Sequence, residues 1–156
     1  MSLLAAPEYN EGLEKLKRNL FIGTVTGILS LALLSFVGFA LGHGWLFSNL
    51  PIEHKVNNFF VALEAKDYQK AYDIYTNGHP NSGYPLQRFT EDWTTESPIG
   101  APILSHHVDI SKTDGSGTFG SGVIVAVHVN SSHKLFMFYD RKDGTLTEPA
   151  PHILQY

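Results

Sequence analysis

Histidine and tyrosine are the side chains of this sequence that could transfer protons. The eight histidines are His43, His54, His79, His106, His107, His128, His133 and His152. His106 and His128 stand in segments that read as strands, on faces that can point into a domain, and Tyr84 or Tyr139 could supply a phenol. A buried histidine beside a carboxylate can act as a general base. These four residues are therefore the candidate pocket.

These residues fit structural roles better than catalytic ones. Strand alternation puts Asp109 on the face opposite His106, and single histidines in strands are usually hydrogen-bonded structural residues. No two histidines have the i,i+4 spacing of a helical zinc pair, and the chain has no cysteine to supply a thiolate. The glycines at 115–122 lie in a turn and a strand start, where they cannot form a phosphate-binding loop. We expect no catalytic residue, no metal site and no cofactor.

Composition narrows the class of protein further. The 156 residues suit one compact domain with an appendage. A hydrophobic content of 43% excludes wholesale disorder. The net charge of −4 argues against nucleic acid as a partner, because binding phosphates needs a basic surface.

The appendage is an apolar segment near the N-terminus. Residues 19–52 contain no Asp, Glu, Lys or Arg. About 20 helical residues cross the roughly 30 Å hydrocarbon layer of a membrane. We therefore expect an N-terminal interfacial arm at 1–19, a transmembrane helix at 20–47 and a soluble domain at 53–156. A buried core helix and a cleaved signal peptide are the alternatives, but the segment is too long and too apolar for either.

Flanking charges set the expected orientation. Lys15, Lys17 and Arg18 precede the segment, and only Lys55 follows it closely. The positive-inside rule then places the N-terminus in the cytoplasm and the domain outside it, in the periplasm if the source is bacterial. The arm itself reads as a short helix capped by Asn10.

Small residues recur on one side of the apolar segment and predict a helix–helix interface with another membrane subunit or with a second copy of the chain. These residues are Gly23, Gly27, Ser30, Ser35, Gly38 and Gly42. The alternative is that glycine is simply common in membrane helices. His43 ends the segment, where we expect it to meet lipid headgroups; a tetrapyrrole or pigment contact is the less favoured reading.

In the soluble part, the spacing of the apolar residues changes along the chain. Apolar residues recur every three to four positions in a helix at 53–65, a second helix follows Asp67 and stops at Gly78, and a third runs from 85 to 95. Alternation then predicts strands at 104–110, 123–129 and 134–139, with an edge strand within 145–156. We expect an α+β domain with two to three helices on one face of a curved antiparallel sheet of three to four strands.

One run supports a family resemblance. Phe59-Phe60-x-Ala62-Leu63, followed by Asp67-Tyr68-x-x-Ala71-Tyr72, resembles the opening helical hairpin of nuclear-transport-factor-2-like domains, the cystatin-like α+β cone superfamily. The resemblance covers about residues 53–147, although no short strand is evident between the second and third helices. It implies a cone-shaped fold that often holds an apolar cavity. Some members are isomerases or dehydratases, and many are binding or assembly modules.

These observations favour a non-catalytic accessory or assembly subunit of a larger membrane complex. A respiratory or photosynthetic electron-transfer complex is the first partner to check. Two alternatives remain, a membrane-anchored binding module for an apolar ligand and an anchored isomerase or hydratase. A filled domain core favours the first reading, and an apolar cavity containing a histidine or aspartate favours the other two.

Overall fold

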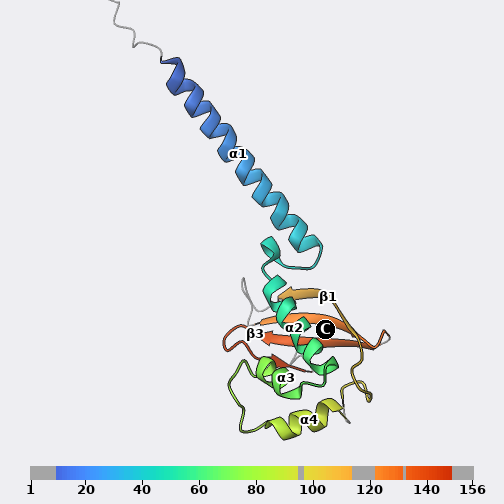
Figure 1. Ribbon diagram of the computed structural model, residues 1–156. Coiled ribbons are helices and arrows are strands. Elements are labelled where there is room, and N and C mark those ends of the chain that lie inside the picture. Colours follow the sequence, from blue (N-terminus) through green and yellow to red (C-terminus); the bar gives the residue numbers. More distant parts are fainter. Residues whose placement is uncertain (1–9, 95–96, 114–121, 132, 149–156) are drawn as a thin grey trace, which may run out of the picture.

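The computed structural model describes residues 10–94, 97–113, 122–131 and 133–148. The helical elements are α1 (Glu11–Ala40), the 3₁₀ turn η1 (Trp45–Phe47), α2 (Leu50–Glu64), α3 (Tyr68–Tyr75) and α4 (Leu86–Thr94). The strands are β1 (His106–Thr113), β2 (Gly122–Val129), β3 (His133–Asp140) and β4 (Leu146–Thr147). The four strands form one antiparallel sheet in chain order, with α2 and α3 on one face and α4 beside α3 at the end of the domain away from α1 (Figure 1). The α+β prediction is confirmed.

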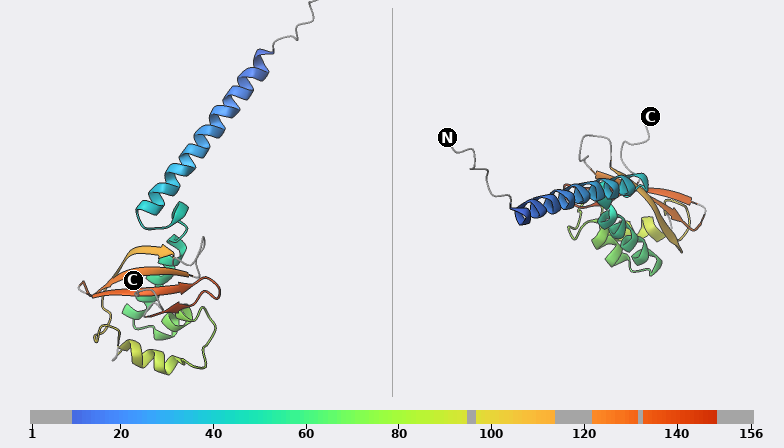
Figure 2. Two further views of the ribbon diagram at one scale, coloured as in Figure 1. Left: turned by 180° about the vertical axis from the view of Figure 1, so that it is seen from behind. Right: turned by 90° about the horizontal axis from the view of Figure 1, so that it is seen from above.

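Helix α1 projects from the domain as a long rod (Figures 1 and 2). It starts where the side chain of Asn10 accepts a hydrogen bond from the backbone N–H of Leu13 at 3.1 Å. It then runs without a break to Ala40, so the expected arm and the apolar segment are one helix. No glycine or proline interrupts the stretch between Leu13 and Leu20, which explains this continuity. The helix is long and apolar enough to cross a membrane, and its most apolar stretch is unburied.

The first two helices of the domain follow the predicted pattern. Val56, Phe59 and Phe60 of α2 are fully buried, as the apolar spacing requires. The side chain of Asp67 caps α3 by accepting from the N–H of Lys70 at 3.1 Å. Gly78, with φ of +73°, closes the C-terminal end. No strand lies between α3 and α4.

The sheet packs its inner face against these helices. Val123, Val125, Val127 and Val129 of β2 are fully buried in the core. Aromatic rings from α2 and α4 fill the space beneath them: the ring centroids of Phe59 lie 6.2 Å from Phe89 and 5.1 Å from Trp93. The valines of β2 and these aromatic rings therefore form one core between the sheet and the helices.

Strand β1 departs from the predicted alternation. It begins at His106, and Leu104 before it is exposed. A bulge then inserts an extra residue, because Val108 pairs with Val127 whereas Ser111 pairs with Val125. The prediction that Ile110 continues the inward face was wrong: the bulge shifts the alternation by one residue, so Ile110 is 37% exposed and Ser111 is buried.

Two tight turns connect the last three strands. Asn130 and Ser131 turn the chain from β2 to β3 with positive φ. Gly144, with φ of +74°, closes the hairpin into β4, whose two residues pair with β3 at the sheet edge. The predicted turn at 114–117, the end of the third helix at 95 and the tail at 149–156 lie outside the described residues.

Candidate functional site

The candidate site is the junction between α1 and the domain, where the chain reverses between Ala40 and Leu50. Gly42 and Gly44 adopt positive φ of +81° and +77°. Gly38 lies directly under the turn: a Cβ on it would sit 2.8 Å from the carbonyl oxygen of Gly44 and 2.9 Å from the nitrogen of Phe47. A side chain at position 38 would force the turn to shift, so glycine lets η1 pack closely against the end of α1.

Backbone hydrogen bonds join this turn to the elements around it. The N–H of His43 donates to the carbonyl of Gly38 at 2.9 Å, and the N–H of Asn49 donates to the carbonyl of His43 at 3.0 Å. The N–H of Ser111, beside the bulge of β1, donates to the carbonyl of Gly42 at 2.8 Å. The end of α1 is thus bonded both to the start of α2 and to the sheet.

A side-chain network completes the junction. The carboxylate of Glu53, which is only 7% exposed, accepts a hydrogen bond from the hydroxyl of Ser111 at 2.6 Å. Both of its oxygens also lie 2.9 Å from Nδ1 of His43. Hydrogen bonds to a carboxylate are stronger than neutral ones, and more so away from water. We call His43, Glu53 and Ser111 the junction network; it holds α1 and the domain together.

The predicted stripe of small residues divides into two parts. Gly38 packs under the turn, and a Cβ on Gly42 would lie 3.1 Å from side-chain carbons of Ile110. Gly23 and Gly27, in contrast, have nothing within 4 Å of the position of a Cβ. Contacts within the chain thus account for Gly38 and Gly42. Gly23, Gly27 and Ser30 are exposed and Ser35 is half-buried, so the helix–helix interface at these residues stays a prediction.

His43 has a structural partner in this arrangement. Its ring bonds to Glu53 through Nδ1 and lies over the ring of Phe47, with centroids 6.3 Å apart. The lipid-headgroup and pigment readings both stay predictions. Trp45 is exposed, and its ring centroid lies 5.4 Å from that of Phe39.

His106 points inward, as predicted, and is covered by α2. Its Nδ1 lies 2.7 Å from a carboxylate oxygen of Glu64, and its Nε2 lies 3.1 Å from the amide oxygen of Asn57. The imidazole also stacks on Phe60, with ring centroids 5.4 Å apart. Because both nitrogens contact oxygen atoms of α2, the residue connects β1 to α2.

His128 lies on the outer face of the sheet. It is paired with the exposed His107 on β1, and its Nδ1 is 3.7 Å from Asp109. The inward reading of His128 was wrong, because the core-facing positions of β2 are its odd-numbered valines. Asp109 in turn accepts from Lys134 at 3.0 Å, and this hydrogen bond is the main reason that the pKa of Asp109 lies below its usual value.

Tyr139 and Tyr84 occupy two further environments. The ring of Tyr139 packs against the core, with the ammonium of Lys55 5.6 Å from its centroid. Tyr84 lies before α4 and lines a small cavity with Tyr75 and Trp93. The four predicted pocket residues therefore do not line one common pocket.

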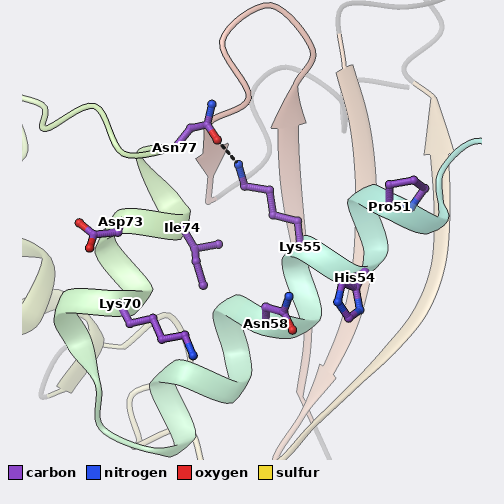
Figure 3. A pocket seen from close by; sticks show the side chains of 8 residues that line it. All are labelled: Pro51, His54, Lys55, Asn58, Lys70, Asp73, Ile74 and Asn77. Atoms are coloured by element: carbon purple, nitrogen blue, oxygen red, sulfur yellow. Dashed lines mark hydrogen bonds between the residues drawn. The ribbon is translucent and has the colours of Figure 1, made fainter.

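A groove between α2 and α3 was not anticipated from the sequence (Figure 3). It has a volume of about 360 Å³, and Lys55 crosses it to donate to the side-chain oxygen of Asn77 at 2.7 Å and to the carbonyl of Gly144 at 2.6 Å. Burial lowers the pKa of Lys55, an effect that Asp143 partly offsets. Lys55, which was considered only as a flanking charge, thus ties α2 to α3 and to the β3–β4 hairpin.

Comparisons with known proteins identify no relative. No family model, no curated protein and no solved structure matches this chain. The resemblance to nuclear-transport-factor-2-like domains therefore stays a prediction.

Proposed function

We propose that this chain is a membrane-anchored accessory or assembly subunit, with α1 in the bilayer and the α+β domain held against the membrane surface. The observation that carries this proposal is the exposed apolar length of α1. Phe21, Ile28 and Phe36 are 69%, 61% and 64% exposed, and the helix has no charge beyond Arg18. The 21 residues from Leu20 to Ala40 extend about 30 Å, the thickness of the hydrocarbon layer.

The junction supports a retained anchor over a cleaved signal. The carbonyl of Gly42 bonds to β1, and the ring of His43 bonds to Glu53 on α2. Cleavage on the C-terminal side of His43 would remove these contacts and leave a buried carboxylate short of a donor, which is costly. The absence of burial along the apolar stretch of α1 also argues against a core helix.

The basic residues Lys15, Lys17 and Arg18 favour a cytoplasmic N-terminus and an extracytoplasmic domain, periplasmic in a bacterium. Gly23, Gly27 and Ser30 then lie within the bilayer, where small residues let a second helix approach closely. The partner we propose is a transmembrane subunit of a larger complex, and electron-transfer complexes are the first class to examine. The resemblance to assembly modules of the cone superfamily agrees with this role.

Native mass spectrometry of the tagged full chain, extracted from its own membranes in a mild detergent, tests the proposal. We expect co-purifying subunits, and we expect Gly27→Leu to remove them because a large side chain blocks close helix approach. Val25→Leu is the matched control: it lies about 160° around the helix from Gly27 and should leave the complex intact. A wild-type chain recovered only as a monomer, or only as a dimer of itself, would contradict the proposal.

A further inference from the structure

A second site lies at the opposite end of the domain from α1. Helix α4 occupies that end in both views of the domain from the side (Figures 1 and 2). A cavity of about 230 Å³ lies between α3, α4 and the residue after β4. Its lining is Tyr75, Tyr84, Asp92, Trp93, Pro98 and Glu148. Neither the anchor nor the junction uses this cavity.

Aromatic rings form its walls and are held in place by the core. The ring centroids of Tyr75 and Tyr84 lie 5.9 Å apart. Both rings contact the fully buried Phe89, at 5.5 Å and 6.1 Å, and Phe89 also contacts Trp93 at 6.0 Å. The three rings that line the cavity are therefore positioned before any ligand arrives. The faces of tyrosine and tryptophan rings attract cations.

The polar groups of the cavity are negative. Asp92 and Glu148 each contribute a carboxylate to the lining, and burial, helped by the nearby carboxylate of Asp92, raises the pKa of Tyr84. Arg88 reaches Asp92 only at 3.9 Å and is itself largely exposed. Burial raises the pKa of Glu148, which shows that its negative charge is poorly solvated.

A neighbouring cavity of about 520 Å³ shares Tyr75 and Tyr84 and provides room for the rest of a ligand. Thr147 lines it, and the hydroxyl oxygen of Thr147 is buried without a hydrogen-bond partner within the described part of the chain. A buried hydroxyl without a partner is unfavourable. A ligand hydroxyl would provide the missing hydrogen bond.

We propose that the smaller cavity, beside Asp92 and Glu148, binds a small water-soluble alkylammonium compound of the choline type. The ammonium group lies among Tyr75, Tyr84 and Trp93, the carboxylates of Asp92 and Glu148 balance its charge, and a hydroxyl reaches Thr147. A metal ion fits less well, because the described residues contain no group of three histidine or carboxylate side chains able to hold one. The location far from α1 favours a free solute over a lipid headgroup.

Calorimetric titration of the full chain in maltoside micelles tests this proposal with two probes. Choline chloride carries the charge, and 3,3-dimethyl-1-butanol is its neutral isostere. We expect saturable choline binding and at least about tenfold weaker binding of the isostere, because cation–π and ionic attraction act only on the charged probe. Adding phosphatidylcholine vesicles tests whether the ligand is a lipid headgroup or a free solute: we expect the vesicles to leave the choline affinity unchanged.

Three variants locate the site. Glu148→Gln should weaken choline binding about tenfold, whereas the control Glu91→Gln, on the exposed side of α4, should leave it unchanged. Tyr84→Phe keeps the aromatic face and should retain binding within a few-fold, and Tyr84→Leu should lose it. Near-UV circular dichroism verifies that each variant is folded. The proposal would be overturned if choline does not bind saturably, or if both probes bind equally well. It would also be overturned if the vesicles compete with choline, or if a folded Glu148→Gln variant keeps full affinity.

Discussion

Replacing Glu53 with alanine should loosen the junction between α1 and the domain. The carboxylate of Glu53 accepts from the hydroxyl of Ser111 at 2.6 Å and lies 2.9 Å from Nδ1 of His43. The variant removes both contacts: the hydroxyl of Ser111 keeps only its longer bond to the carbonyl of Gly42 at 3.2 Å, and the half-buried ring of His43 loses its carboxylate partner. No other described side chain bonds to Nδ1 of His43, so the ring loses its link to α2.

The magnitude follows from the number and type of bonds lost. A hydrogen bond to a charged group contributes about 1.5–3 kcal/mol, so two of them total about 3–6 kcal/mol. Desolvation of the buried carboxylate offsets part of this sum. We therefore expect Glu53→Ala to lower the free energy of unfolding by about 3 kcal/mol. Glu53→Gln keeps an acceptor for Ser111 and should cost about 1 kcal/mol.

Urea unfolding of the full chain in maltoside micelles, followed by near-UV circular dichroism, measures these differences. Limited proteolysis reports separately on the junction, and we expect faster cleavage within residues 41–49 of Glu53→Ala. Glu91→Ala, an exposed acid on α4, is the control and should stay within about 0.5 kcal/mol of the wild type. If Glu53→Ala matches this control in both assays, the junction network does not hold the anchor and the reasoning is refuted.

Three other predictions address the anchor and the domain. In urea unfolding, Gly38→Ala should destabilise the protein by about 1 kcal/mol, because its Cβ meets backbone atoms of the turn. Gly27→Ala should be neutral or stabilising. Equal effects of the two variants would contradict the packing of Gly38 under the turn. Tyr84→Phe should lessen the loss of stability above pH 10. Burial raises the pKa of Tyr84, so the folded chain keeps a proton that the unfolded chain releases as the pH rises. Urea unfolding of both proteins at pH 9 and pH 11 measures this effect, and an equal decline in the free energy of unfolding of the two proteins would refute it. Because the chain has no cysteine, an impermeant maleimide applied to intact cells should label Lys142→Cys and spare Lys17→Cys, and the reverse pattern would overturn the orientation.

Much of the fold could be predicted because it depends on local patterns. The apolar spacing of Val56, Phe59 and Phe60 marks the buried face of α2, and Asp67 caps the next helix through its own side chain. The strongly apolar strand at 123–129 was likewise predicted and corresponds to β2. Each of these features follows from residues within a few positions of one another.

The junction could not be predicted, because its partners are far apart in the sequence. Glu53 and Ser111 are 58 positions apart, and the bulge that turns Ser111 inward has no signal in an alternating apolar strand. Gly38 and Gly42 looked like part of an intermolecular stripe because the turn that covers them was unknown. The cavity beside Tyr75 and Trp93 could not be predicted either, because periodicity does not reveal which core residues border a cavity.

Alkaline carbonate extraction of membranes that contain the full chain tests the central proposal, that α1 lies in lipid, most directly. We predict that the wild-type chain stays in the membrane pellet, as an integral protein does. The double variant Ile28→Lys and Leu31→Lys should enter the soluble fraction, because each lysine at the middle of the span costs about 2.5–3.5 kcal/mol of insertion free energy. Release of the wild-type chain into the supernatant would contradict the proposal.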